Sequence, residues 1–127
     1  MADRKKWTSA EREAVYQKTG GRCAYCGQEI TRQEMQLDHV KPVKLYEELD
    51  GGAGLNDLEN ILPACRSCNH YKHTFTLEKF RAALERMPAV LERDSVTYRN
   101  AVRFGLVQPT PHKVRFYFET MKAGDGT

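Results

Sequence analysis

Four cysteines arranged as two C-x-x-C pairs constrain this chain more than any other feature. Cys23 and Cys26 form the first pair, Cys65 and Cys68 form the second, and no cysteine is left over. Four thiolates suit Zn²⁺, which takes closed tetrahedral sulfur ligation in structural sites. The alternatives are buried free cysteines or a redox pair, but a redox C-x-x-C is typical of a thioredoxin-like βα pattern, which this sequence lacks. The sequence therefore predicts a structural zinc site, with metal binding as part of folding.

The length of the chain fits one small domain, and its net charge does not identify a binding partner. The chain has 127 residues, enough for a single domain over 1–127 but hardly for two. Its formal charge of +3 is too small to identify a nucleic-acid binder by itself. The N-terminus carries no apolar run, so we expect a cytoplasmic protein without a secretion signal or a membrane span.

Local patterns predict short elements around the cysteine pairs. Thr8 and Glu11 have the spacing of a capping box, which predicts a helix over 9–19 that ends at Gly20 and Gly21. Further expectations are strands over 35–40 and 60–63, a surface excursion over 44–58, helices over 66–73, 76–86 and 95–104, and a half-buried strand over 114–118. This order of elements predicts a single α+β domain.

Polar residues between the two cysteine pairs suggest a reactive site. Asp38, His39 and Asn60 all lie in this segment, which is longer than the usual gap of a zinc ribbon. His39 suits the role of a general base, because imidazole titrates near neutral pH. Adjacent residues of a strand point to opposite faces, so Asp38 and His39 are expected to serve different roles.

Together these positions resemble the signature of the HNH endonucleases. The matching residues run in order over 23–73: Cys23-x-x-Cys26, Asp38-His39, Pro42, Gly51-Gly52, Asn60 and Cys65-x-x-Cys68-Asn69-x-x-Lys72. The resemblance implies a ββα-metal core, with an N-terminal helix before it and a helical and strand extension over 75–120 after it. It also implies a metal-dependent endonuclease that hydrolyses DNA phosphodiester bonds, by nicking or by double-strand cleavage.

The resemblance assigns a role to each polar position. It implies that His39 activates water, that Asn60 orients His39 through the loop backbone, and that Asp38 and Asn69 hold the catalytic ion. His73 is a third candidate ligand, because it lies four residues after Asn69 and colicin-like members carry a histidine pair at this spacing. Oxygen ligands favour Mg²⁺ or Mn²⁺, whereas His73 would widen the choice to Ni²⁺ or Zn²⁺.

The expected substrate is double-stranded DNA. Candidate phosphate contacts are Lys41, Arg66, His70 and Lys72. Nothing in the sequence resembles a base-reading module, so we expect low sequence specificity or a protein partner that supplies it. We expect a monomer or a homodimer, in the setting of a phage, a restriction system or a mobile element.

Three other interpretations stay open at this point. The chain could be a zinc-stabilised module that binds nucleic acid without cutting it, or a nuclease directed at RNA. The third is a protein-interaction zinc domain of the LIM or RING kind, although such domains ordinarily bind two zinc ions through more Cys and His ligands.

Overall fold

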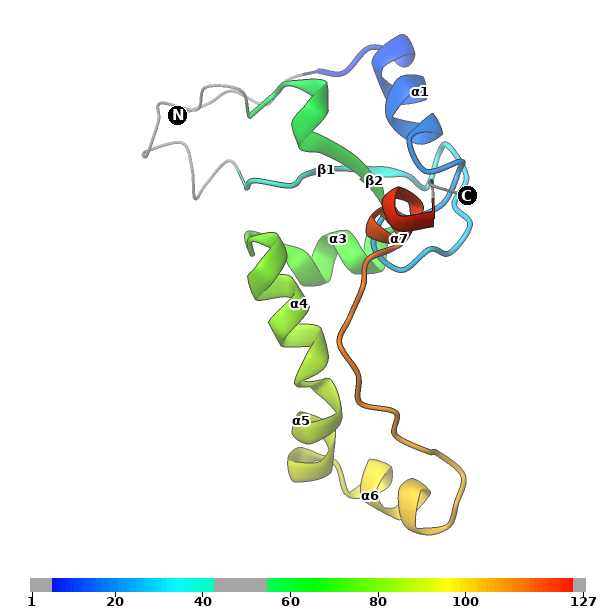
Figure 1. Ribbon diagram of the computed structural model, residues 1–127, viewed down its shortest axis with the longest axis vertical. Coiled ribbons are helices and arrows are strands. Elements are labelled where there is room, and N and C mark those ends of the chain that lie inside the picture. The colour runs from blue at the N-terminus through cyan, green and yellow to red at the C-terminus, as the bar shows by residue number, and fades with distance from the viewer. Residues whose placement is uncertain (1–5, 43–54, 125–127) are drawn as a thin grey trace. The chain divides into compact units, whose positions relative to one another are not determined.

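The computed structural model describes residues 6–42 and 55–124 (Figure 1). Contacts divide the chain into two compact units: unit 1 comprises Met1–Leu77 and Arg115–Thr127, and unit 2 comprises Glu78–Val114. The excursion expected over 44–58 lies outside the described residues as far as position 54. Within the described residues, no helix is long and apolar enough to cross a membrane.

A two-stranded antiparallel sheet lies at the centre of unit 1. The strands are β1 (Gln36–His39) and β2 (Ile61–Ala64), and a short 3-10 helix, η1 (Leu58–Asn60), leads into β2. In this register Asp38 lies opposite Leu62, and His39 lies opposite Ile61. β2 leads directly into α3 (Arg66–Lys72), so the expected two strands and a helix follow one another (Figure 1).

Helix α1 (Ser9–Gln17) packs on this sheet and begins where the sequence predicted. The Thr8 hydroxyl accepts a hydrogen bond from the Glu11 amide, and the Glu11 carboxylate accepts one from the Thr8 amide, each at 3.0 Å. The two glycines after the helix have φ of 60° and 81°, as a helix C-terminus requires. The Lys18 ammonium donates to the carbonyl of Ile61 at 2.7 Å and so fastens the end of α1 to β2.

The strand expected over 114–118 is wrong, because Tyr117–Gly124 forms a helix, α7. The Glu119 carboxylate accepts a hydrogen bond from the Phe116 amide at 2.8 Å, which caps the first turn. Phe116 itself is buried in the core of unit 1. The alternation of apolar residues was therefore produced by core packing just before and inside a helix start, and not by strand geometry.

The core of unit 1 consists of apolar side chains from α1, β2 and the connecting segments. Its buried apolar residues are Val15, Cys23, Ala24, Tyr25, Ile30, Met35, Leu55, Ile61, Ala64 and Phe116. Three of them, Cys23, Ala24 and Tyr25, belong to the first cysteine pair or lie inside it. The first cysteine pair is thus part of the core of unit 1.

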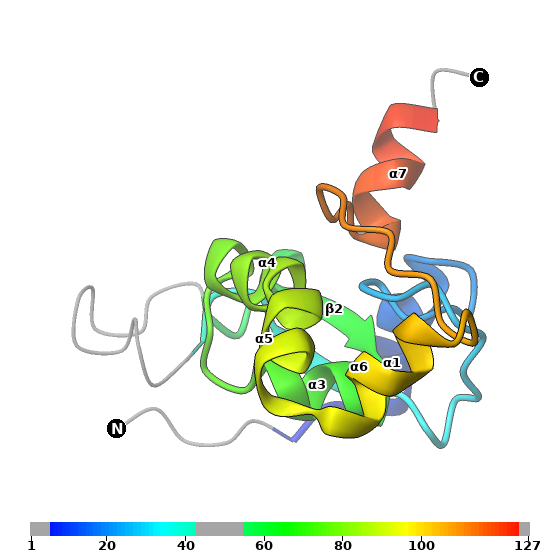
Figure 2. The same ribbon diagram turned by 90° about the horizontal axis from the view of Figure 1, so that it is seen from below.

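Unit 2 consists of short consecutive helices (Figures 1 and 2). They are α4 (Leu77–Glu85), α5 (Met87–Asp94) and α6 (Val96–Arg103). Pro88 lies in the first turn of α5, a helix that the sequence analysis did not predict. Ser95 caps α6 by accepting a hydrogen bond from the Tyr98 amide at 3.0 Å. The mixed α and β class that we expected is confirmed.

Candidate nuclease site

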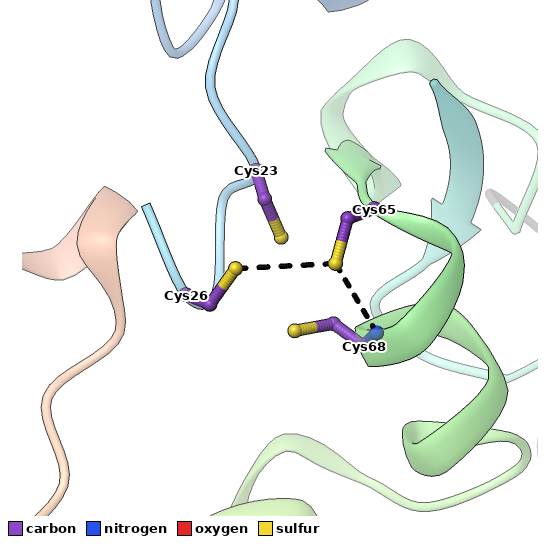
Figure 3. A group of neighbouring side chains, drawn as sticks. All are labelled: Cys23, Cys26, Cys65 and Cys68. Carbon is purple, nitrogen blue, oxygen red and sulfur yellow. Dashed lines mark hydrogen bonds between the residues drawn. The ribbon is translucent and has the colours of Figure 1, made fainter. Parts of the chain in front are cut away.

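The four cysteines converge on one point between a loop and the start of α3 (Figure 3). Their sulfur atoms all lie within 4.8 Å of one another, and the Sγ atoms of Cys26 and Cys65 are 3.9 Å apart. Tetrahedral ligation at about 2.3 Å requires sulfurs about 3.8 Å apart. Among the described residues, no other group of three or more Cys, His, Asp or Glu side chains comes this close together. The donor set and spacing fit a structural zinc ion.

Backbone amides already point at the sulfurs, as they do around metal thiolates. The Tyr25 amide donates to Cys23 Sγ at 3.4 Å, and the Cys68 amide donates to Cys65 Sγ at 3.3 Å. The second of these bonds also caps the N-terminus of α3. Gly27 turns the chain back after the first pair with φ of 79°, a conformation in which a side chain would be strained.

The thiols do not ionise independently of one another. A hydrogen bond from Cys68 lowers the pKa of Cys23 to about 4, and the same bond raises the pKa of Cys68. Burial is the main cause that raises the pKa of Cys26. Without a cation the cluster therefore favours one thiolate over four, whereas a bound zinc ion supplies the charge that four thiolates need.

Asp38 lies on β1 with its carboxylate almost fully buried. Its Oδ2 atom accepts a hydrogen bond from the Tyr25 hydroxyl at 2.5 Å and lies 3.1 Å from the Lys72 ammonium. Burial raises the pKa of Asp38, while the Lys72 charge and the Tyr25 hydroxyl act in the opposite direction. The carboxylate thus faces α3, the helix that also carries Asn69.

Lys72 does not occupy the position that a phosphate contact requires. Its side chain is 0% exposed, and its ammonium donates to the His39 carbonyl at 3.0 Å in addition to pairing with Asp38. The sequence analysis had placed Lys72 among the candidate phosphate contacts. The structure corrects this interpretation, because the helix turns Lys72 inward, where it neutralises the buried carboxylate.

His39, the neighbour of Asp38, is held by a different partner. Its Nε2 atom lies 2.9 Å from Oδ1 of Asn56, and its ring centroid lies 6.4 Å from that of Trp7. An amide oxygen can only accept, so Nε2 carries the proton and Nδ1 keeps the basic lone pair. The sequence analysis missed Asn56, and no motif position could have identified it.

Asn60 organises the backbone beside His39 through hydrogen bonds of its side-chain amide. Its Oδ1 accepts from the Lys41 amide at 2.8 Å, and its Nδ2 donates to the Lys41 carbonyl at 3.2 Å and the Leu55 carbonyl at 2.9 Å. Its own carbonyl accepts from the Val40 amide at 2.8 Å. Asn60 therefore ties the segment after His39 to the segment that carries Asn56.

The remaining candidate ligands lie on α3 or just beyond it. Asn69 is half-buried in the helix, as the motif requires. His73 is exposed and caps the helix C-terminus with a φ of 48°, so it is no longer part of the helix. The His73 amide still donates to the Asn69 carbonyl at 3.0 Å, and its role as a third ligand stays a prediction.

Three expected phosphate contacts do lie at the surface of unit 1. Lys41 follows β1, Arg66 begins α3, and His70 lies one residue after Asn69; all three side chains are exposed. Positive groups at these positions can meet a polyanion without prior rearrangement. Their role in binding stays a prediction.

The structure thus places a four-cysteine cluster beside a strand that carries Asp38-His39 and a helix that carries Asn69. Residues 23–75 match the family model described as HNH endonuclease, so the resemblance stated for the sequence is confirmed over this segment. The matched residues include every cysteine of the cluster together with Asp38, His39, Asn60 and Asn69.

A similar protein is YoqL of Bacillus subtilis (strain 168), which is SPbeta prophage-derived and named as an HNH endonuclease. The two are 34% identical over 61 residues, which is 46% of this chain and 26% of the relative. The chain thus spans about a quarter of that relative's length. No solved structure matches the chain.

Proposed function

We propose that this protein is a metal-dependent endonuclease that hydrolyses phosphodiester bonds in double-stranded DNA with low sequence specificity. One observation carries the proposal: the adjacent residues Asp38 and His39 of β1 are turned to different partners. The Asp38 carboxylate is buried and pairs with Lys72 of α3, whereas the His39 imidazole hydrogen-bonds to Asn56. A strand that separates an acid from a base in this way can present them to different atoms of one phosphate.

His39 acts as the general base. With its proton on Nε2, the imidazole can take a proton from water at Nδ1, and its partner Asn56 keeps the ring in that tautomer. Asn60 serves this role indirectly, since it holds together the two backbone segments on either side of the imidazole. Proton transfer by a positioned base typically contributes about 10²- to 10⁴-fold in rate.

Asp38 and Asn69 are the residues that would hold a catalytic divalent ion. A carboxylate and an amide oxygen suit a hard ion, so Mg²⁺ or Mn²⁺ is preferred. Such an ion, when bound, supplies positive charge for the phosphate and the leaving oxygen. His73 is a less suitable third ligand, because it lies outside α3 and is exposed.

Nucleic acid would be held by the exposed cations Lys41 and Arg66 and by the exposed imidazole of His70. These groups recognise phosphates and carry no sequence information. Specificity therefore comes from elsewhere, and a protein partner is the expected source. An origin in a phage or another mobile element agrees with the prophage origin of the relative.

The experiment that tests this function is plasmid nicking by zinc-loaded protein with Mg²⁺, Mn²⁺ or Ni²⁺ and without added metal. The wild-type chain is compared with His39→Ala, and His112→Ala is the matched control because this exposed histidine belongs to unit 2. We expect metal-dependent nicking that is lost in His39→Ala and retained in His112→Ala, with equal zinc content. DNA binding without cutting by any variant would favour a binding module, and faster cleavage of RNA than of DNA would favour the RNA-directed alternative.

A further inference from the structure

Tyr25 contacts both the cysteine cluster and the site on β1. It lies between Cys23 and Cys26, and its amide donates to Cys23 Sγ at 3.4 Å. Its side chain extends away from the cluster and donates its hydroxyl hydrogen to Asp38 Oδ2 at 2.5 Å. A single residue therefore links a sulfur of the zinc knuckle to the carboxylate that would hold the catalytic ion.

The Tyr25 ring is held in place by its surroundings. It is 4% exposed, and it packs edge-on against Phe116 with centroids 5.2 Å apart and against Phe118 at 6.2 Å. Its carbonyl accepts a hydrogen bond from the Tyr117 amide at 3.1 Å. The residues that pack against Tyr25 lie beyond the segment that matches the HNH family.

The bond from Tyr25 also determines which oxygen of Asp38 remains for a cation. Oδ2 accepts from the Tyr25 hydroxyl and pairs with the Lys72 ammonium. A carboxylate oxygen offers about two lone-pair sites, so these two partners saturate Oδ2. A divalent ion would be bound through Oδ1, and the hydroxyl of Tyr25 sets the rotation that presents it.

We propose that Tyr25 is a positioning residue that couples the four-cysteine site to Asp38, so that a folded zinc knuckle sets the carboxylate orientation needed to bind the catalytic ion. This inference rests on the proposed function, because it takes Asp38 as a ligand. It assigns the first cysteine pair a role in the active site in addition to its role in stability. Groups that hydrogen-bond to a metal ligand typically change metal affinity by about 10- to 100-fold.

The test compares Mn²⁺ binding to the zinc-loaded full chain in two tyrosine variants. Tyr25→Phe removes the hydroxyl but keeps the ring that packs against Phe116. Tyr16→Phe is the matched control, since its hydroxyl donates to a backbone carbonyl, that of Ile30, at 2.7 Å. Free Mn²⁺ is measured by electron paramagnetic resonance, zinc by elemental analysis, and steady-state nicking gives kcat and KM.

We expect Tyr25→Phe to raise the Mn²⁺ dissociation constant about tenfold and to lower kcat, with the KM for DNA and the zinc content unchanged. Tyr16→Phe should leave all four quantities at the wild-type level. Equal Mn²⁺ affinity in Tyr25→Phe and wild type would overturn the coupling, as would the absence of Mn²⁺ binding to the wild-type chain. Weakened Mn²⁺ binding in Tyr25→Phe by a protein that nicks no DNA would uphold the coupling and refute the nuclease function.

A second variant covers the case in which Tyr25→Phe loses its zinc. Phe116→Leu keeps the hydroxyl bond but loosens the packing of the Tyr25 ring, and it lies outside the cysteine cluster. Under the coupling, this variant binds Mn²⁺ more weakly than wild type while it retains one zinc ion per chain. Wild-type Mn²⁺ affinity in zinc-loaded Phe116→Leu would count against the coupling.

Discussion

The Lys72 ammonium lies 3.1 Å from Oδ2 of Asp38, and neither side chain is more than 5% exposed. This buried ion pair joins α3 to β1 at the point where the proposed catalytic ion would bind. An isolated buried carboxylate is costly, so the pair allows an acidic ligand to exist in the core. The Lys72 ammonium also donates a hydrogen bond to the backbone carbonyl of His39, the proposed base.

Lys72→Met is expected to destabilise the protein strongly. It removes one partner of a buried pair and leaves the Asp38 charge uncompensated, which typically costs about 3–5 kcal/mol. Urea unfolding of the zinc-loaded protein measures the change. The double variant Asp38→Asn/Lys72→Met should recover much of the loss, since it leaves no buried charge; a double variant as unstable as Lys72→Met would show that the methionine itself fits poorly.

Asn56→Asp is expected to move the acid limb of the pH–rate profile to higher pH. The new carboxylate would face the Nε2 atom of His39 at the position now held by Oδ1, 2.9 Å away. A negative charge there stabilises the imidazolium form, so a higher pH is needed to free the base. Nicking rates from pH 5 to 9 measure the effect. An unchanged acid limb would mean that the rate does not depend on the protonation of His39.

Asn60→Ala is expected to cost about 1–3 kcal/mol of stability, because it leaves the part-buried Leu55 carbonyl without its donor and frees the Lys41 amide. Activity should fall further than stability alone explains, since the two segments around His39 lose their connection. Urea unfolding and nicking under conditions where the variant is fully folded separate the two effects. Asn60→Asp, which keeps the acceptor for the Lys41 amide, should be intermediate in stability.

Removal of zinc is expected to unfold unit 1. The purified protein should hold one zinc ion per chain, and a strong chelator should abolish the cooperative thermal transition, because the cluster is continuous with the core through Cys23. Cys26→Ser, which changes the exposed ligand, should lower the zinc content without direct damage to the core. Circular dichroism with elemental analysis follows both. A chelated chain with an unchanged transition would contradict a structural role for the metal.

Features encoded locally were predictable from the sequence. The capping box of Thr8 and Glu11 placed the start of α1, and the spacing of the cysteines gave the cluster, because each depends on neighbours in the chain. Features that depend on the tertiary fold were not. The inward turn of Lys72 and the contact between Asn56 and His39 arise only once α3 and the loop before η1 have packed against β1.

The errors in secondary structure have the same origin. Alternating apolar residues around the start of α7 suggested a strand. The Phe116 ring is buried because it packs against Tyr25, and Glu119 caps a helix that begins at Tyr117. The sequence analysis also missed α5, whose first turn contains Pro88, because proline is tolerated in the first turn of a helix as well as in a loop.

Unit 1 is assembled from two stretches of chain, with Glu78–Val114 inserted between them. The two stretches contact each other at the first cysteine pair, where the Phe118 amide donates a hydrogen bond to the Ala24 carbonyl at 2.9 Å. Closing a flexible connection costs only about 0.6 kcal/mol more for each doubling of its length. We therefore expect unit 1 to keep its fold when the inserted helices are exchanged for longer or shorter ones, so that other sequences can be inserted at this position.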